Sequence, residues 1–205
     1  MQSNKAMKIQ IHYIFTLLVF KCILVQSQVD TNRIDEDGLR QGPWTEYINE
    51  RGLTKLLGGY KDDKKEGWFY AHYSNDSVAV IANYKDGLLE GELRNFHSNG
   101  SLKFSGVYKA GMKNGKFTDF WGNGNVKTIN HYCNDTICGD YFEYFKSGII
   151  QISAIKSKSN DKIDNWVFYY ENGAIRLTGR KLGDENIGDW VEYSEDGQIL
   201  KVINH

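Results

Sequence analysis

Hydrophobic side chains recur along this chain every 24 or 25 residues, each two positions after a glycine or the residue in its place. The hydrophobic positions are Trp44, Phe69, Leu93, Phe117, Tyr141, Trp166 and Trp190. The preceding positions are Gly42, Gly67, Gly91, Gly115, Gly139, Asp164 and Gly188. A period held over seven units indicates a repeat architecture, in which each unit packs mainly on its neighbours. We expect the seven hydrophobic residues to form the shared core.

A second aromatic residue stands five positions after the glycine in most units. The members are Tyr47, Phe96, Phe120, Tyr144, Tyr169 and Tyr193. In the second unit His72 has this place and Tyr73 follows, which indicates one inserted residue. The two aromatic positions have opposite parity along a strand. Either both faces of a sheet carry aromatic residues, or a β-bulge turns one of them to the other face.

The second half of each unit begins with a turn signal and continues as an alternating strand. Asn-Gly, as at residues 99–100, 123–124 and 172–173, favours a hairpin because both positions tolerate positive φ. Apolar residues of one parity follow, as in the pairs Leu102 and Phe104, Ile150 and Ile152, and Ile175 and Leu177. The alternation predicts that each pair shares one face, with Lys103, Gln151 and Arg176 on the opposite face.

The predicted fold is all-β: an elongated single array of about seven antiparallel β-hairpins without a substantial helix. A unit of 24 residues has room for two strands of roughly 6 to 9 residues and two turns. Residues 157–163 interrupt the pattern before the sixth unit, where Asp164 replaces the glycine. We expect a protruding loop or a local kink there.

Residues 1–27 lie outside the repeat and have the layout of a signal peptide. Lys5 and Lys8 precede a short apolar run, and Ser27 ends a stretch suited to cleavage. We therefore expect an exported protein, periplasmic or extracellular, with a flexible lead-in at residues 28–37 and the array at residues 38–205. A retained membrane anchor is the alternative, although the apolar run is shorter than the roughly 20 residues that span a bilayer.

Two cysteines remain after such a cleavage, Cys133 and Cys138. They flank a segment where other units have a turn, and an exported chain meets oxidising conditions that allow a disulfide. A bridge across the base of a hairpin turn is the prediction, and two reduced thiols are the alternative.

The repeat units resemble the variant MORN repeat, most clearly in the phrases at residues 164–173 and 188–193. The resemblance covers about residues 38–205. Bacterial proteins of this kind are often labelled as antitoxin components, in the YwqK-like family, so it implies a protein partner and an antitoxin-like or immunity-like role. A weaker similarity to choline-binding and glucan-binding cell-wall repeats is limited by their shorter period and second tryptophan.

Composition and motifs reveal little chemistry. A net charge of −1 argues against a nucleic-acid partner. The histidines form no metal-ligand pattern, and no motif predicts a cofactor. Carboxylates recur four positions after the unit glycine, at Glu46, Asp119, Glu143 and Glu192. They are expected to form a solvated row, and a cation site or a hydrolytic role is the alternative.

Four aromatic residues outside the main pattern are candidates for an exposed partner-binding patch: Tyr70, Phe142, Phe168 and Tyr170. The function predicted from the sequence is that of a non-enzymatic, monomeric repeat scaffold that binds a protein. The alternative is a protein of the cell envelope that binds a carbohydrate polymer or a lipid surface.

Overall fold

The computed structural model describes residues 30–50, 52–157 and 163–205. The chain divides into two units, Met1–Thr31 and Asn32–His205, and the account below concerns the second. The predicted signal peptide at residues 1–27 and most of the predicted loop at residues 157–163 lie outside the described residues. None of the described segments forms a helix with the length and hydrophobicity that a membrane crossing requires.

The described residues form one sheet of 17 strands. In chain order the strands are β1 (Arg33–Ile34), β2 (Arg40–Glu50), β3 (Leu53–Lys61), β4 (Lys64–Lys65), β5 (Gly67–Tyr73), β6 (Val78–Lys85), β7 (Leu88–Phe96), β8 (Leu102–Lys109), β9 (Met112–Phe120), β10 (Val126–Cys133), β11 (Thr136–Ile137), β12 (Tyr141–Tyr144), β13 (Ile150–Ile155), β14 (Ile163–Tyr169), β15 (Ile175–Leu182), β16 (Glu185–Tyr193) and β17 (Ile199–Asn204).

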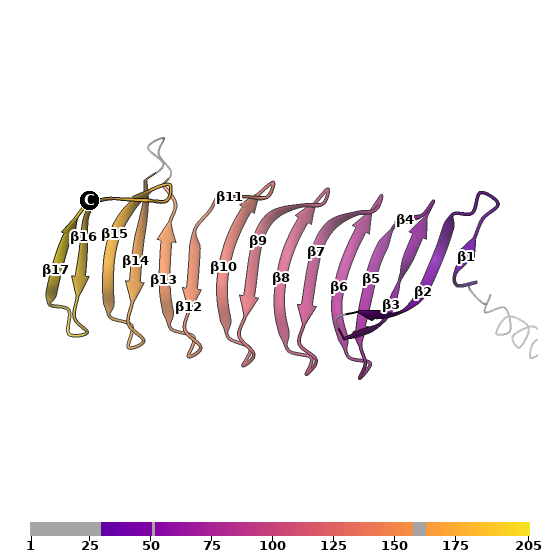
Figure 1. Cartoon of the computed structure of the whole chain (residues 1–205), viewed down its shortest axis with the longest axis horizontal. Coiled ribbons are helices and arrows are strands. Elements are labelled where there is room, and N and C mark those ends of the chain that lie inside the picture. The colour runs from indigo at the N-terminus through magenta and orange to yellow at the C-terminus, as the bar shows by residue number, and fades with distance from the viewer. Residues whose placement is uncertain (1–29, 51, 158–162) are drawn as a thin grey trace, which may run out of the picture. The chain divides into compact units, whose positions relative to one another are not determined.

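The strands follow one another across the sheet in the order of the chain (Figure 1). Each long strand pairs antiparallel with the next, and the two-residue strands β4 and β11 pair with β3 and β10 at the turns. The same pattern continues from β12 to β17. The predicted fold class, an all-β array of antiparallel hairpins, is confirmed.

The repeating glycine lies in a β-bulge. Between the pairs Ala82–Leu93 and Tyr84–Leu89 the register shifts, and Gly91 in this interval has a φ of 85°. The next unit repeats the shift, with Gly115 at 111°. Only glycine adopts such angles without steric cost. The period seen in the sequence therefore records a backbone requirement of five of the seven units, since Gly42, Gly67 and Gly188 also have positive φ and Gly139 and Asp164 do not.

A second bulge lies next to the Asn-Gly turn, at the start of the second strand of the hairpin, and decides which residues share a face. The consecutive residues Asn95 and Phe96 pair with Phe104 and Leu102, which leaves Lys103 as an extra residue. Because directly opposed residues point to the same face, Leu102 and Phe104 lie on opposite faces. The prediction that they share one face is wrong, because simple alternation does not allow for the bulge.

The same bulge recurs in five further hairpins, at the register shifts between β5 and β6, β9 and β10, β12 and β13, β14 and β15, and β16 and β17. Since the bulge lies on the second strand, alternation along the first strand continues unbroken. The aromatic residues two and five positions after the glycine therefore point to opposite faces. The sequence left two alternatives open, and the structure has the one in which both faces of the sheet carry aromatic residues.

The two ends of each hairpin use different turns. At the Asn-Gly turns only the glycine has positive φ, as at Gly100 (84°), and its N–H donates to the carbonyl oxygen of His97 at 2.8 Å. Most turns between units have two successive residues at positive φ, for example Ala110 at 49° and Gly111 at 82°, whereas the last turn has positive φ only at Gly183. The pair of positive signs is that of a two-residue type I′ turn.

The first edge of the sheet is covered by residues that the sequence assigned to a flexible lead-in. Strand β1 pairs with β2 through Arg33–Gln41 and Ile34–Arg40. The Asn32 side chain extends this pairing, because its amide donates to the carbonyl oxygen of Thr45 at 2.8 Å and its oxygen accepts from the Thr45 N–H at 2.6 Å. Residues 32–37 therefore differ from the flexible lead-in that the sequence predicted. Their polar groups form hydrogen bonds with the backbone at the edge of β2.

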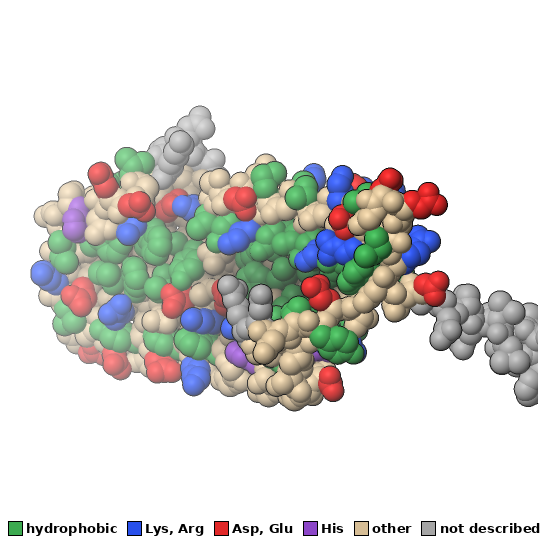
Figure 2. All heavy atoms as spheres, turned by 45° about the vertical axis from the view of Figure 1, so that its right-hand side comes forward, with side chains coloured by type: hydrophobic (Ala, Val, Ile, Leu, Met, Phe, Trp, Pro, Cys, Tyr) green, Lys and Arg blue, Asp and Glu red, His purple; other side chains and the backbone are tan. Residues whose placement is uncertain are grey.

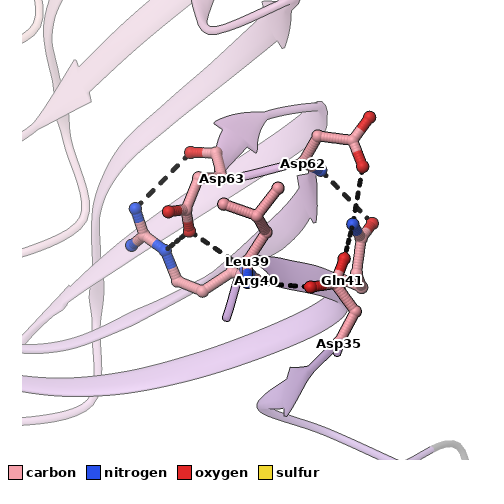
Figure 3. Close-up of polar contacts among 6 residues, drawn as sticks. All are labelled: Asp35, Leu39, Arg40, Gln41, Asp62 and Asp63. Carbon is pink, nitrogen blue, oxygen red and sulfur yellow. Dashed lines mark hydrogen bonds and ion pairs between the residues drawn. The ribbon is translucent and has the colours of Figure 1, made fainter. Parts of the chain in front are cut away.

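A network of polar contacts holds this covering segment to the first turn between units (Figure 3). Asp63 Oδ1 accepts from both the backbone N–H and the Nε of Arg40, at 3.0 and 2.8 Å. Gln41 Nε2 donates to Asp35 Oδ2 at 2.7 Å and to Asp62 Oδ1 at 2.6 Å. Repeat arrays need a polar end that replaces the missing neighbour, and these residues provide it.

Asp164 occupies a place where the glycine bulge is missing. The register from β13 to β14 runs without a shift, so no positive φ is required at this position. The Asp164 carboxylate is buried and accepts from Lys156 Nζ at 2.5 Å and from the Ser157 N–H at 3.2 Å. An ion pair thus stands where other units have a glycine.

Candidate functional site

One face of the sheet carries the repeated hydrophobic residues, and we call it the ring face. Each of the seven lies beside a glycine or alanine on a neighbouring strand. Gly106, for example, pairs with Leu93 on one side and with Phe117 on the other. The rings lie directly over these small residues, because a Cβ added to Gly106 would be only 2.5 Å from Phe117 Cδ1. Close contact of ring and backbone is therefore a feature of the array.

A row of tyrosines on the ring face was missed by the sequence reasoning. Its members, spaced by 24 residues, are Tyr60, Tyr84, Tyr108 and Tyr132. Their rings meet the core rings edge to face, with centroids 5.1 Å apart for Phe69 and Tyr84 and 5.0 Å apart for Phe117 and Tyr132. The signal was present, since tyrosine recurs with the period of the glycine.

Cations lie over this row. Arg40 Cζ is 3.9 Å from the centroid of the Tyr60 ring, and Lys113 Nζ is 4.7 Å from that of Tyr132. Lys65 lies between two rings, 5.0 Å from Phe69 and 4.8 Å from Tyr84, and its burial lowers the pKa of its ammonium group. The methylene stems shield the rings while the charges face the π-systems.

Two carboxylates of the predicted row, on the ring face, accept hydrogen bonds from different hydroxyl groups. Asp119 Oδ2 accepts from Thr128 Oγ1 at 2.7 Å, and Glu143 Oε2 accepts from the Tyr141 hydroxyl at 2.7 Å. Burial, followed by this hydrogen bond, raises the pKa of the Tyr141 phenol. Among the described residues no group of three or more histidine, cysteine, aspartate or glutamate side chains could hold a metal ion.

A hollow of about 510 Å³ opens beside the ring face, near the Ser147-Gly148 turn of the fifth unit and the Asn172-Gly173 turn of the sixth. Its lining includes Gln151, Ile152, Phe168, Tyr170, Arg176 and Glu195. The Arg176 guanidinium carbon lies 5.9 Å from the centroid of the Phe168 ring. The prediction that Arg176 points to the face opposite the apolar residues is therefore wrong, because Arg176 is the extra residue of a bulge.

Comparison with known families identifies two of the repeats. Residues 89–110 and 113–134 match the MORN repeat variant. The two matches cover the third and fourth units, and each begins two residues before the unit glycine. No curated protein matches the chain. The resemblance to MORN repeats that the sequence indicated over seven units is thus shown for two of them.

The repeat units bury the predicted core to different degrees. Phe69, Phe117 and Trp190 are almost fully buried, at 3%, 3% and 4% exposure. Trp44, Leu93, Tyr141 and Trp166 are half-buried. Hydrophobic side chains form a band along the middle of the face shown in Figure 2, with charged side chains along its borders. A single sheet layer thus buries its core by lateral contact between rings.

The four predicted partner-binding residues do not form one patch. Tyr70 is 36% exposed and, like the half-buried Phe142, lies on the face opposite the rings. Phe168 lies on the ring face, 6.1 Å from Trp166 between ring centroids. Tyr170 is half-buried, and its hydroxyl donates to the Tyr193 carbonyl oxygen at 2.8 Å. Phe168 and Tyr170 meet in the hollow, and their binding role stays a prediction.

The cysteines lie at the turn that joins the fourth and fifth repeat units. The structure joins Cys133 and Cys138 by a disulfide, with Cα atoms 5.7 Å apart. Both residues are exposed. Cys133 at the end of β10 pairs with Thr136 of β11. The redox state of the pair in the cell stays a prediction.

Proposed function

We propose that this chain is a non-enzymatic scaffold that binds a protein partner through its sheet. MORN repeats in the chain support a scaffold, since arrays of stacked units present extended surfaces. The partner is argued from exposed aromatic residues in the first two units. Tyr47, Trp68 and Tyr70 are 80%, 50% and 36% exposed and lie on the face opposite the rings.

These three residues have the chemistry of a protein-binding surface. Tyr47 lies on β2 and Trp68 and Tyr70 lie on β5, with β3 between them. Tyrosine and tryptophan are enriched in the residues that dominate binding energies in protein interfaces. Burial of such exposed aromatic side chains against a partner has a more favourable free energy than their exposure to water.

The test is capture of a partner by the full-length chain, tagged at its C-terminus, from the envelope fraction of its native host. We expect one stoichiometric protein, and we expect the double variant Trp68→Ser, Tyr70→Ser to lose it. Val202→Ser is the matched control, because Val202 is 48% exposed at the far end of the sheet. Recovery of wall polymer or lipid without a protein contradicts the proposal and supports the alternative of an envelope-binding protein.

An immunity-like role is the more specific form of the proposal. It is supported by the resemblance to antitoxin-labelled MORN proteins and by the signal-peptide layout of residues 1–27, which suits an exported immunity protein. Coexpression with a toxic protein encoded beside the gene tests it: we expect growth to be restored by the wild-type chain. A partner with no toxic activity contradicts this form and leaves the scaffold proposal intact.

The rival class is an enzyme that uses the carboxylate row. Asp119 and Glu143 each accept a hydrogen bond from a neighbouring hydroxyl, and in the register both are opposite Thr128. They are thus two strands apart, about 10 Å between backbones. We propose that the row keeps the sheet soluble. A turnover that Glu143→Gln or Glu192→Gln abolishes contradicts this assignment.

A further inference from the structure

The hollow beside Phe168 arises from a departure of one unit from the repeat. Four positions after the unit glycine, the other units carry Glu46, Ala71, Asn95, Asp119, Glu143 and Glu192. The sixth unit alone carries an aromatic residue there, Phe168. Because the backbone of this position is the same in each hairpin, the ring is not a requirement of the fold. The exception points to a local role.

The rings of this hollow are held in place before any ligand arrives. Phe168 lies between Trp166 and Trp190, at centroid distances of 6.1 and 6.2 Å. The Tyr170 hydroxyl is fixed by its bond to the Tyr193 carbonyl oxygen at 2.8 Å. A ligand that stacks on fixed rings pays little for ordering them.

Polar groups of both kinds surround the rings. Gln151 and Arg176 supply donors, and Glu171 and Glu195 supply carboxylate acceptors. Glu195 Oε2 is positioned by Asn172 Nδ2 at 3.1 Å. Within the described part of the chain, the side chains of Gln151 and Arg176 have no hydrogen-bond or ion-pair partner. They are available to a ligand.

The combination selects a class of ligand. An anionic ligand would meet two carboxylates, and a purely apolar ligand would leave the guanidinium and carboxylates unpaired. A pyranose sugar fits both features, since its C–H face packs on an aromatic ring and its hydroxyl groups both donate and accept hydrogen bonds. At about 510 Å³ the hollow has room for a short oligosaccharide. We propose that it binds a neutral oligosaccharide of pyranose sugars.

The site goes beyond the proposed protein-binding function, because it lies on the ring face and not on the face of Tyr47, Trp68 and Tyr70. The probes are maltotriose, cellotriose and triacetylchitotriose, titrated against the full-length chain by isothermal calorimetry. We expect one of them to bind at a single site with a Kd of about 1 mM or lower. Phe168→Glu restores the residue type of the first, fifth and seventh units, so the fold is expected to tolerate it.

Two variants and one control decide the proposal. Phe168→Glu, and Phe168→Leu which keeps an apolar side chain without the ring, are expected to weaken binding about tenfold or more. Glu46→Gln changes the corresponding position of the first unit and is expected to bind as the wild type does. Circular dichroism of each variant checks that the sheet is retained. Binding of none of the three probes overturns the proposal, and so does equal binding by a folded Phe168→Leu variant.

Discussion

The close contact between ring and backbone predicts that Gly106→Ala destabilises the array. Gly106 is buried between Leu93 and Phe117 and does not have positive φ. Its backbone would thus accept alanine, and any penalty arises from the added methyl group. That Cβ would lie 2.5 Å from Phe117 Cδ1 and 2.9 Å from Phe117 Cζ, where ordinary contact begins at 3.4 Å.

The magnitude follows from what confines the ring. Phe117 must retreat by about 0.9 Å, yet it is 3% exposed and meets Tyr108 and Tyr132 at centroid distances of 5.3 and 5.0 Å. Overpacking of this kind costs about 1–3 kcal/mol. Alanine also restricts the unfolded chain, which offsets about 0.4–1 kcal/mol. We expect a net loss of about 1–2 kcal/mol, or about 3–6 °C in Tm.

Urea and thermal unfolding followed by circular dichroism measure the effect. Gly122→Ala is the matched control: Gly122 also lacks positive φ, and a Cβ there would meet nothing within 4 Å. The control is expected to unfold at the wild-type midpoint or slightly above. Because a repeat array can open locally, amide hydrogen exchange in β8 and β9 is measured as well and should accelerate only in Gly106→Ala.

A second substitution tests the cause. Phe117→Leu places at this position the residue that the third unit carries at Leu93, next to Gly106 and Ala82. In the Gly106→Ala background it should cost less than in the wild type, because the smaller side chain accommodates the methyl group. Equal stability of Gly106→Ala and Gly122→Ala, or strictly additive effects of Gly106→Ala and Phe117→Leu, would refute the steric reasoning.

Three further predictions concern the turns, the tyrosines and the cysteines. Ala110→Asn should raise the free energy of unfolding by about 1 kcal/mol, since Ala110 has a φ of 49° that asparagine tolerates better; a lower urea midpoint would contradict this. Burial raises the pKa of Tyr60, Tyr84, Tyr108 and Tyr141, so their contribution is complete below the unfolded pKa of about 10 and is lost as pH rises above it. Tm measured from pH 8 to 11.5 should fall as phenolate absorbance at 295 nm appears, and a constant Tm would disprove the assignment. Alkylation followed by intact-mass measurement should show no free thiol at Cys133 or Cys138, and the double serine variant should lose about 2 kcal/mol, as expected for a loop this short; two alkylated cysteines would count against the bridge.

The sheet and its unit length follow from residues that any hairpin of this kind needs. A glycine is required where the bulge imposes positive φ, as at Gly91 and Gly115. A large side chain is required two positions later, where it covers a glycine or alanine of the next strand. Local backbone geometry repeats in most units, so its residue signals repeat too, and this period predicts the fold.

The site was less predictable because it depends on bulges and on contacts between units. Alternation assigned Arg176 to the wrong face, since one extra residue in the second strand reverses every later position. Tyr170 and Phe168 were chosen as exposed residues, but whether a ring is exposed depends on neighbours such as Tyr193 and Trp190, which lie in the next unit. Sequence spacing does not contain that information.

By itself, the sequence determined the antiparallel hairpins and their number, because both follow from residues close together within one unit. Only the tertiary structure decided the faces, the tyrosine and cation row and the hollow beside Phe168. Each of these depends on residues that meet across strands, as Phe117 meets Tyr132 and Phe168 meets Trp190, and the register that brings them together is set by the bulged backbone of the array.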